Sequence, residues 1–261
     1  MLRSAAFALL AQAGRALEGA GALLQYAAAG TLSLGTLRAA LARRWEAFGS
    51  TETETYRDSG LMPWEREFLN AAVKPGDRVL VVGCGTGRDI IALLRWGCRV
   101  DGIDIADACV ATARAAVAAR GFSAFLETGT LDSVTLPARY DVVLFSWYCY
   151  SYLPGADARI ATLRRAREAL GADGRIVISY LLPTDSRRYS LIAVTRLVAG
   201  LTGSDWRPER GDVLMLSAAN GYGVHYEHHF AKADFEAEAQ AAGLRVASHE
   251  IADDGLAVLV P

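Results

Sequence analysis

The stretch from residue 79 to residue 104 constrains the fold more than any other part of the chain. It opens on the apolar, β-branched run Arg78–Val82, which is typical of a central parallel strand covered on both faces. Three closely spaced glycines follow, and glycine lets a backbone turn sharply and approach a ligand closely. We expect a strand, a glycine turn and a helix that begins near the third glycine. The turn consists of Gly83, Cys84, Gly85, Thr86 and Gly87.

An acid stands where the second strand of this unit ends. Residues 99–103 predict that strand, and Asp104 follows directly. Open α/β sheets bind ligands at the carboxyl ends of their strands, where an acid can accept hydrogen bonds from ribose hydroxyls. We therefore expect a nucleoside-containing cofactor. The dinucleotide fingerprint G-x-G-x-x-G would require a glycine where this chain has Arg88.

The spacing G-x-G-x-G resembles the first motif of the class I S-adenosylmethionine-dependent methyltransferases, and the resemblance extends over residues 70–261. The family implies S-adenosylmethionine as cofactor and a doubly wound α/β fold with a mostly parallel seven-stranded sheet and an antiparallel last strand. The residues support the reversed strand independently. Residues 244–251 and 256–260 predict two strands, and the tight turn between them forces an antiparallel pair.

The resemblance also implies which residues bind the cofactor. Gly129-Thr130 stands where the family usually carries Gly-Asp, and Val81 stands where many members carry an acid. The adenine contact is therefore assigned to Asp132 or to the backbone around Leu131. The expected cofactor-binding residues are Gly83, Cys84, Gly85, Thr86, Gly87, Asp104, Ile105, Leu131, Asp132, Ser146 and Trp147.

An aromatic loop, residues 147–154, follows the strand predicted over residues 140–146. Its position at a strand's carboxyl end places it beside the reacting methyl group. Aromatic ring faces stabilise cations such as a sulfonium, although simple packing would also explain the rings. We expect Tyr148 as a catalytic candidate, and Tyr150 and Tyr152 as substrate or lid residues.

The N-terminal residues 1–70 predict a helical cap or lid. Apolar residues recur at helical spacing through residues 1–44, but charged residues interrupt them and exclude a continuous membrane span. We expect packed helices, with a membrane-surface or partner-binding helix as the alternative. A second helix is predicted over residues 35–48, followed by a polar, turn-rich segment, residues 51–64. By the resemblance, Tyr56 and Trp64 are lid candidates in this region.

The remaining residues, 71–261, form the expected methyltransferase domain, with an insertion at about residues 182–222 that contains an apolar helix. Insertions in such folds generally carry specificity. Residues 223–230, if extended, place His225, Glu227 and His229 on one face and His228 on the other. We take His225 and His228 as candidate general bases, with ordinary pocket lining as the alternative. His225 and His229 alone supply too few ligands for a metal, and none is expected.

Composition narrows the function further. The net charge is −2 and the basic residues are not clustered, which argues against a nucleic-acid partner. The four cysteines show no C-x-x-C pairing, as expected of free thiols in a cytoplasmic protein. We expect methyl transfer to a small, hydrophobic acceptor. The alternatives are a nicotinamide-dependent oxidoreductase, and a non-catalytic protein that binds a membrane or a partner through its N-terminal helix.

Overall fold

The computed structural model describes residues 2–183, 186–217 and 223–261. A seven-stranded sheet in the order β3-β2-β1-β4-β5-β9-β8 forms its centre. β9 runs antiparallel to its neighbours β5 and β8, and the other neighbouring strands pair in parallel. This confirms the doubly wound fold and the reversed last strand. The strands are β1 (Arg78–Val82), β2 (Arg99–Asp104), β3 (Leu126–Thr128), β4 (Tyr140–Phe145), β5 (Leu170–Tyr180), β8 (Arg245–Ile251) and β9 (Gly255–Val260).

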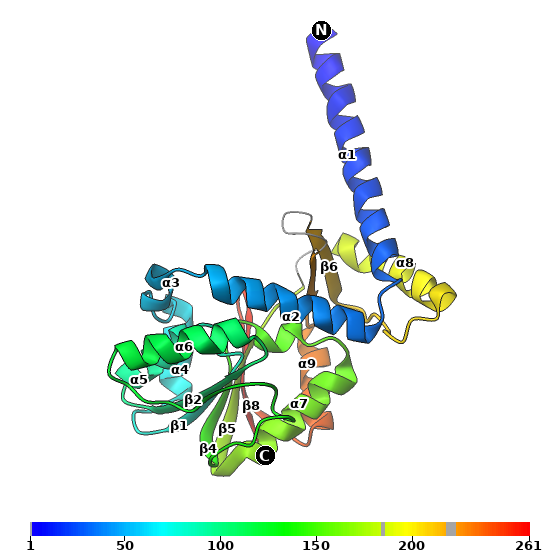
Figure 1. Cartoon of the computed structure of the whole chain (residues 1–261). Helices are drawn as coiled ribbons and strands as arrows, with labels where there is room; N and C mark the ends of the chain where they lie inside the picture. Colours follow the sequence, from blue (N-terminus) through cyan, green and yellow to red (C-terminus); the bar gives the residue numbers. More distant parts are fainter. Residues whose placement is uncertain (1, 184–185, 218–222) are drawn as a thin grey trace.

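Helices cover both faces of the sheet (Figure 1). The alternation of β1 explains this, because Val79 and Val81 pack into one core cluster and Leu80 packs into the other. A strand buried on both sides needs helices on both sides. One layer contains α4 (Pro63–Ala72), α5 (Arg88–Arg95) and α6 (Asp107–Ala119); the other contains α7 (Ala156–Ala169) and α9 (Lys232–Ala241).

The insertion forms a substructure of its own. It contains the predicted apolar helix, α8 (Ser186–Thr202), and a hairpin of β6 (Asp212–Ser217) and β7 (Gly223–His228) that forms a separate two-stranded sheet. The sequence predicted the extended form of β7 but not its partner β6. Residues 184–185 and 218–222, which belong to the predicted insertion, lie outside the described residues.

The N-terminal segment forms three helices, α1 (Leu2–Ala29), α2 (Leu34–Thr51) and α3 (Glu54–Asp58). Only the C-terminal end of α1 packs against α8, and the rest of the helix extends away from the body (Figure 1). Phe7 and Leu17 are accordingly 73% and 74% exposed. The packing that the apolar spacing of α1 predicts is thus confined to its last turns. Among the helices that the structure describes, none combines the length and the apolar character that a membrane crossing requires.

Helix α2 lies across α6 and reaches β7 (Figure 1). The close approach depends on Gly49, because a Cβ there would lie 2.6 Å from the backbone nitrogen of Cys109. One element differs from the sequence prediction, because the turn-rich segment after α2 contains the short helix α3, capped by the Thr53 hydroxyl.

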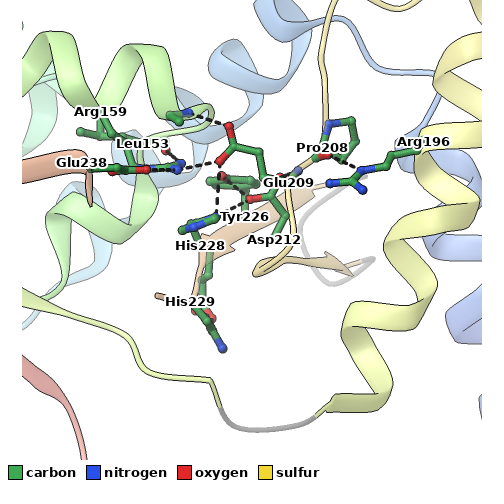
Figure 2. A network of polar contacts seen from close by, with 12 residues as sticks. Leu153, Arg159, Arg196, Pro208, Glu209, Asp212, Tyr226, His228, His229 and Glu238 are labelled. Atoms are coloured by element: carbon green, nitrogen blue, oxygen red, sulfur yellow. Dashed lines mark hydrogen bonds and ion pairs between the residues drawn. The ribbon is translucent and has the colours of Figure 1, made fainter. Parts of the chain in front are cut away.

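A buried ionic network holds the hairpin to the core (Figure 2). Arg159, on α7, is 1% exposed and its Nη2 donates to Glu238 on α9 and to Glu209 ahead of β6, both at 2.6 Å. Asp212, at the start of β6, accepts from the Tyr226 hydroxyl and pairs with His228 Nδ1, each at 2.7 Å. The network therefore connects both strands of the hairpin to two core helices.

Replacing Arg159 with methionine should lower the free energy of unfolding by about 3–5 kcal/mol, because it leaves buried carboxylates without their cation. Thermal or urea unfolding would measure the loss. The matched control is Arg165→Met, which removes an exposed ion pair with Asp132 and should cost less than about 1 kcal/mol. Equal losses in the two variants would show that the buried network does not stabilise the fold.

Candidate functional site

The glycine turn follows β1 and is shaped by three left-handed backbones. Gly83, Gly85 and Gly87 have φ angles of +74°, +52° and +95°, a region that strains residues other than glycine. A Cβ at Gly83 would lie 2.4 Å from the sulfur of Cys149, whereas a Cβ at Gly85 would meet nothing within 4 Å. The missing Cβ of Gly83 therefore allows Cys149 to pack against the turn, whereas the backbone of Gly85 has free space beside it.

Asp104 holds the turn in place from the end of β2. Its Oδ2 accepts from the Gly85 nitrogen at 2.9 Å, and its Oδ1 accepts from the Ala106 nitrogen at 3.0 Å. Burial raises the pKa of this carboxyl, and the backbone donors offset the shift only in part. Each oxygen retains a further acceptor position, so the carboxylate can also bind a pair of hydroxyls.

A second buried cluster begins one residue after the turn. Arg88, which is 4% exposed, pairs through Nη2 with Glu65 at 2.5 Å and with Asp89 at 2.6 Å. Its guanidinium lies 4.6 Å from the Trp147 ring and 5.5 Å from the Tyr56 ring. Asp89 also accepts from the Ser146 hydroxyl. The cluster joins the start of α5 to α4, to the lid segment and to the loop after β4.

This cluster has more negative than positive charge. Glu65 and Asp89 share the single cation Arg88. Burial and the Asp89 charge together raise the pKa of the Glu65 carboxyl, as expected where two carboxylates compete for one guanidinium. Arg88 Nη1 is buried and has no hydrogen-bond partner within the described part of the chain. The site can therefore accept both a positive group and an additional acceptor for Nη1.

The loop after β4 is strained and aromatic. Trp147 and Tyr148 have φ angles of +49° and +60°, which are uncommon for such residues and cluster at functional sites. Trp64 stacks on Tyr148 at 5.8 Å, and the Tyr148 hydroxyl donates to Asp254 at 2.6 Å. Tyr56 meets the edge of Trp147 at 6.3 Å. The two lid candidates, Tyr56 and Trp64, thus both contact this loop.

The N-terminal helices reach over the turn itself. The Thr86 hydroxyl donates to Glu52, the residue that follows α2, and Glu46 accepts from the Ala108 nitrogen at 3.0 Å. Burial raises the pKa of the Glu52 carboxyl, and the bond from Thr86 offsets this only in part. A segment distant in sequence therefore contacts both the glycine turn after β1 and the start of α6, which follows β2.

Comparison with known proteins gives the family. Residues 79–174 match the family described as a methyltransferase domain. The chain is 32% identical over 170 residues to the ubiquinone biosynthesis O-methyltransferase of Xanthomonas axonopodis pv. citri (strain 306), an alignment that covers 58% of this chain and 70% of that protein. The chain belongs to the S-adenosylmethionine-dependent methyltransferases. It is accordingly an enzyme, and its cofactor is S-adenosylmethionine.

Solved structures agree with the fold of this methyltransferase. The Burkholderia thailandensis 1,6-didemethyltoxoflavin-N1-methyltransferase is 18% identical, with a TM-score of 0.61 over 87% of this chain and 90% of that one. The CcbJ methyltransferase from Streptomyces caelestis is 20% identical, with a TM-score of 0.58 over 82% of this chain and 94% of that one. The open backbone at Gly85, the doubly bonded Asp104 carboxylate and the excess of buried negative charge all fit a cationic nucleoside cofactor.

Three residues expected at the methyltransferase site have contacts within the protein that bear on their expected roles. Tyr150 is fully buried, stacks on Phe230 at 5.4 Å and donates to Glu238, so its expected role as a substrate or lid residue is corrected to one in the core. Asp132 is exposed and pairs with Arg165 at 2.6 Å, which engages the carboxylate that we expected to bind adenine. The Trp147 ring lies 4.6 Å from the Arg88 guanidinium.

The candidate bases divide between the two faces of the hairpin. His228 is bound to Asp212 in the network that anchors the hairpin, so its expected catalytic role is corrected to a structural one. Glu209, Asp212 and His228 do place ligand atoms within 4.8 Å of one another. Arg159, Tyr226 and backbone nitrogens already bind these carboxylates, so protein groups account for the cluster without an ion (Figure 2). His225 lies on the opposite face.

Sequence reasoning missed the residues that complete the site. Arg88 and Asp89 directly follow the third glycine, and their adjacency to the turn was the available signal. Glu65 and Glu52 gave no local signal, because their importance comes from contacts across 23 and 34 residues.

Neutralising Glu52 should strengthen the contact of the segment after α2 with the glycine turn. The pKa of the Glu52 carboxyl is raised where the segment contacts the turn, so this contact binds a proton more tightly than the separated segment does. The contact is therefore strongest below pH 4.5, the ordinary pKa of a glutamate, and weakens as the pH rises through the raised pKa. Glu52→Gln removes the buried charge but keeps an acceptor for Thr86. At pH 7 it should slow hydrogen exchange of residues 52–58 several-fold by mass spectrometry.

Glu54→Gln is the matched control, since Glu54 is exposed in the same segment. Faster exchange in Glu52→Gln than in the wild type would show that the Glu52 charge does not weaken the contact of this segment with the glycine turn.

Proposed function

We propose that this methyltransferase transfers a methyl group to a small, hydrophobic acceptor. The observation that carries the proposal is the enclosure of the strained loop after β4. Helices α2 and α3, together with α4, supply Trp45, Tyr56 and Trp64 to its aromatic residues. Aromatic rings gathered beside the cofactor turn favour a compact apolar acceptor over a macromolecule. The net charge of −2 also argues against nucleic acid as the acceptor.

The cofactor roles are assigned to residues that converge on the turn. Asp104 would accept from the ribose hydroxyls, and the backbone at Gly85 would lie against the cofactor. Because Arg165 engages Asp132, we assign the adenine contact to the backbone around Leu131. The other residues that would border the cofactor are Gly83, Cys84, Thr86, Gly87, Ile105, Ser146 and Trp147.

Arg88 would bind the methionine end of the cofactor. Its buried Nη1 can donate to the cofactor carboxylate, and the carboxylates of Glu65 and Asp89 can balance the cofactor's positive charges. When bound, the cofactor supplies an electrophilic methyl group. The protein would orient that group toward the acceptor and exclude water, which can lower a barrier by about 7–11 kcal/mol in favourable cases.

The division of the chain follows from these roles. We assign residues 1–70 to a helical cap whose C-terminal part acts as the lid. Residues 71–261 form the cofactor-binding domain, and the insertion at residues 182–222, with β7, forms the acceptor side of the site.

Removing the Asp104 carboxylate should weaken cofactor binding. Asp104→Ala loses bonds to a charged acceptor, each worth about 1.5–3 kcal/mol, so its affinity for S-adenosylhomocysteine should fall at least tenfold by isothermal titration calorimetry. Asp132→Ala should bind as the wild type does, because that side chain is exposed and paired with Arg165. NADH and NADPH serve as negative controls. Unchanged affinity in Asp104→Ala, or preferential binding of a nicotinamide, would refute the assigned cofactor site.

The role of Arg88 can be tested by comparing a ligand that has the amino-acid end of the cofactor with one that lacks it. Arg88→Lys keeps the buried charge but loses the second terminal nitrogen of the guanidinium. It should reduce the affinity for S-adenosylhomocysteine about tenfold and leave the affinity for adenosine, which lacks the amino-acid end, unchanged. Calorimetry with both ligands would measure the difference, after thermal unfolding has shown that the variant folds. Equal losses for both ligands would place Arg88 outside the methionine subsite.

A further inference from the structure

One face of β7 carries a carboxylate held between two imidazoles. Glu227 accepts from His225 Nε2 at 2.5 Å on one oxygen and from His229 Nε2 at 3.0 Å on the other. The alternation of the strand separates this face from Tyr226 and His228, which bind Asp212. Figure 2 shows His228 directed into the anchoring network and His229 directed away from it. The hairpin is therefore fixed by one face and presents a polar triad on the other.

The charge of Glu227 determines which nitrogen of the His225 ring carries the proton. Burial alone would raise the pKa of the Glu227 carboxyl, but the hydrogen bonds from the two histidines outweigh it and lower the pKa to about 2. A carboxylate can only accept, so Nε2 of His225 is the donor in this pair. In the neutral imidazole, Nδ1 then carries a lone pair and can accept a proton.

No donor within the described residues binds the lone pair on Nδ1 of His225. His225 is 8% exposed, and its Nδ1 is a buried atom without a hydrogen-bond partner in the part of the chain that the structure describes. Buried polar atoms in folded proteins are almost always paired, so an unpaired one in a candidate site indicates a group that a ligand satisfies.

The position of His225 relates it to the cofactor turn. Its ring lies 5.8 Å from the ring of Tyr152, which lies 5.1 Å from the ring of Trp45 on α2. Tyr152 ends the short helix η1 (Cys149–Tyr152), and the sulfur of Cys149 at its start occupies the space next to Gly83. One turn of helix therefore separates the first glycine of the cofactor site from the side chains beside His225.

We infer that His225 is the general base for an acceptor hydroxyl, that Glu227 positions it, and that the acceptor is a phenol methylated on oxygen. The inference rests on the proposed function. The neighbouring rings of Trp45 and Tyr152 suit an aromatic acceptor. A hydroxyl, unlike a thiolate or an amine, needs a base to become a strong nucleophile at neutral pH.

The step balances with the groups named. The acceptor O–H bond breaks as its proton moves to Nδ1 of His225, and the oxygen forms a bond to the methyl carbon. The carbon–sulfur bond breaks with its electron pair on sulfur, leaving S-adenosylhomocysteine and the methyl ether. The imidazolium, stabilised by Glu227, then returns its proton to water. Other titratable or charged groups near this face include His229, which binds Glu227, and Tyr152 with its neighbours Cys149, Arg44 and Tyr56.

The tautomer can be measured without any acceptor. In the full-length protein with ¹⁵N-labelled histidine, the imidazole spectrum at pH 7 should contain a signal with a protonated Nε2 and a bare Nδ1, and this signal should disappear in His225→Asn. A His225 with its proton on Nδ1, or with both nitrogens protonated, would overturn the inference. This readout does not depend on cofactor binding.

Methyl transfer supplies the second test. With catechol and a panel of monohydric phenols, His225→Asn should lower the rate of O-methylation at least 100-fold and leave the affinity for S-adenosylhomocysteine unchanged. Transfer to thiophenol, which ionises unaided, should be far less sensitive. His249→Asn is the matched histidine control, because His249 binds Tyr180 and Glu236 outside this face.

The role of Glu227 is tested by the pH profile. Glu227→Gln should shift the pH of half-maximal O-methylation downward, since the imidazolium loses its carboxylate, whereas a merely structural role would lower the rate at all pH values equally. If S-adenosylhomocysteine binds but no phenol is methylated, the acceptor assignment fails and the cofactor assignment stands. If S-adenosylhomocysteine does not bind, the proposed function itself fails.

Discussion

The pairing of the Asp104 carboxylate with two backbone nitrogens is the interaction on which the rest of the site depends. It joins the end of β2 to the turn after β1 through the Gly85 nitrogen, and to the start of the next helix through the Ala106 nitrogen. Burial disfavours the charged carboxylate, as its raised pKa shows, so keeping an acceptor at this position lowers the free energy of unfolding. Such a cost is characteristic of functional sites, where a ligand rather than the fold uses the group.

Two buried arginines organise different parts of the structure. Arg88 is shared by two carboxylates and retains an unpaired nitrogen, so its cluster is incomplete in both charge and hydrogen bonding. Arg159 is enclosed by Glu238, Glu209 and the Leu153 carbonyl, and its network is closed. The contrast separates a cluster that can bind a ligand from one that fixes the hairpin. A closed network on one face of β7 leaves the other face free to carry His225 and Glu227.

The acceptor side of the site is assembled from segments that are distant in the chain. Trp45 on α2, Tyr152 on η1 and His225 on β7 form one ring-to-ring series, although 180 residues separate its ends. The segment after α2 contacts the glycine turn through Glu52 and Thr86. Helix α2 contacts both α6 and β7, so it connects the cofactor side of the sheet to the hairpin.

The sequence by itself determined the sheet, the glycine turn, Asp104 and the reversed last strand, because each depends on local periodicity and turn chemistry. It also placed His225, Glu227 and His229 on one face, since strand alternation is a local property. Only the tertiary structure decided that Tyr150 turns into the core, that Arg165 engages Asp132 and that Nη1 of Arg88 has no hydrogen-bond partner among the described residues. It likewise supplied β6 as the partner of β7. These features depend on which side chains from remote segments meet at one place, and no spacing within a single segment records that meeting.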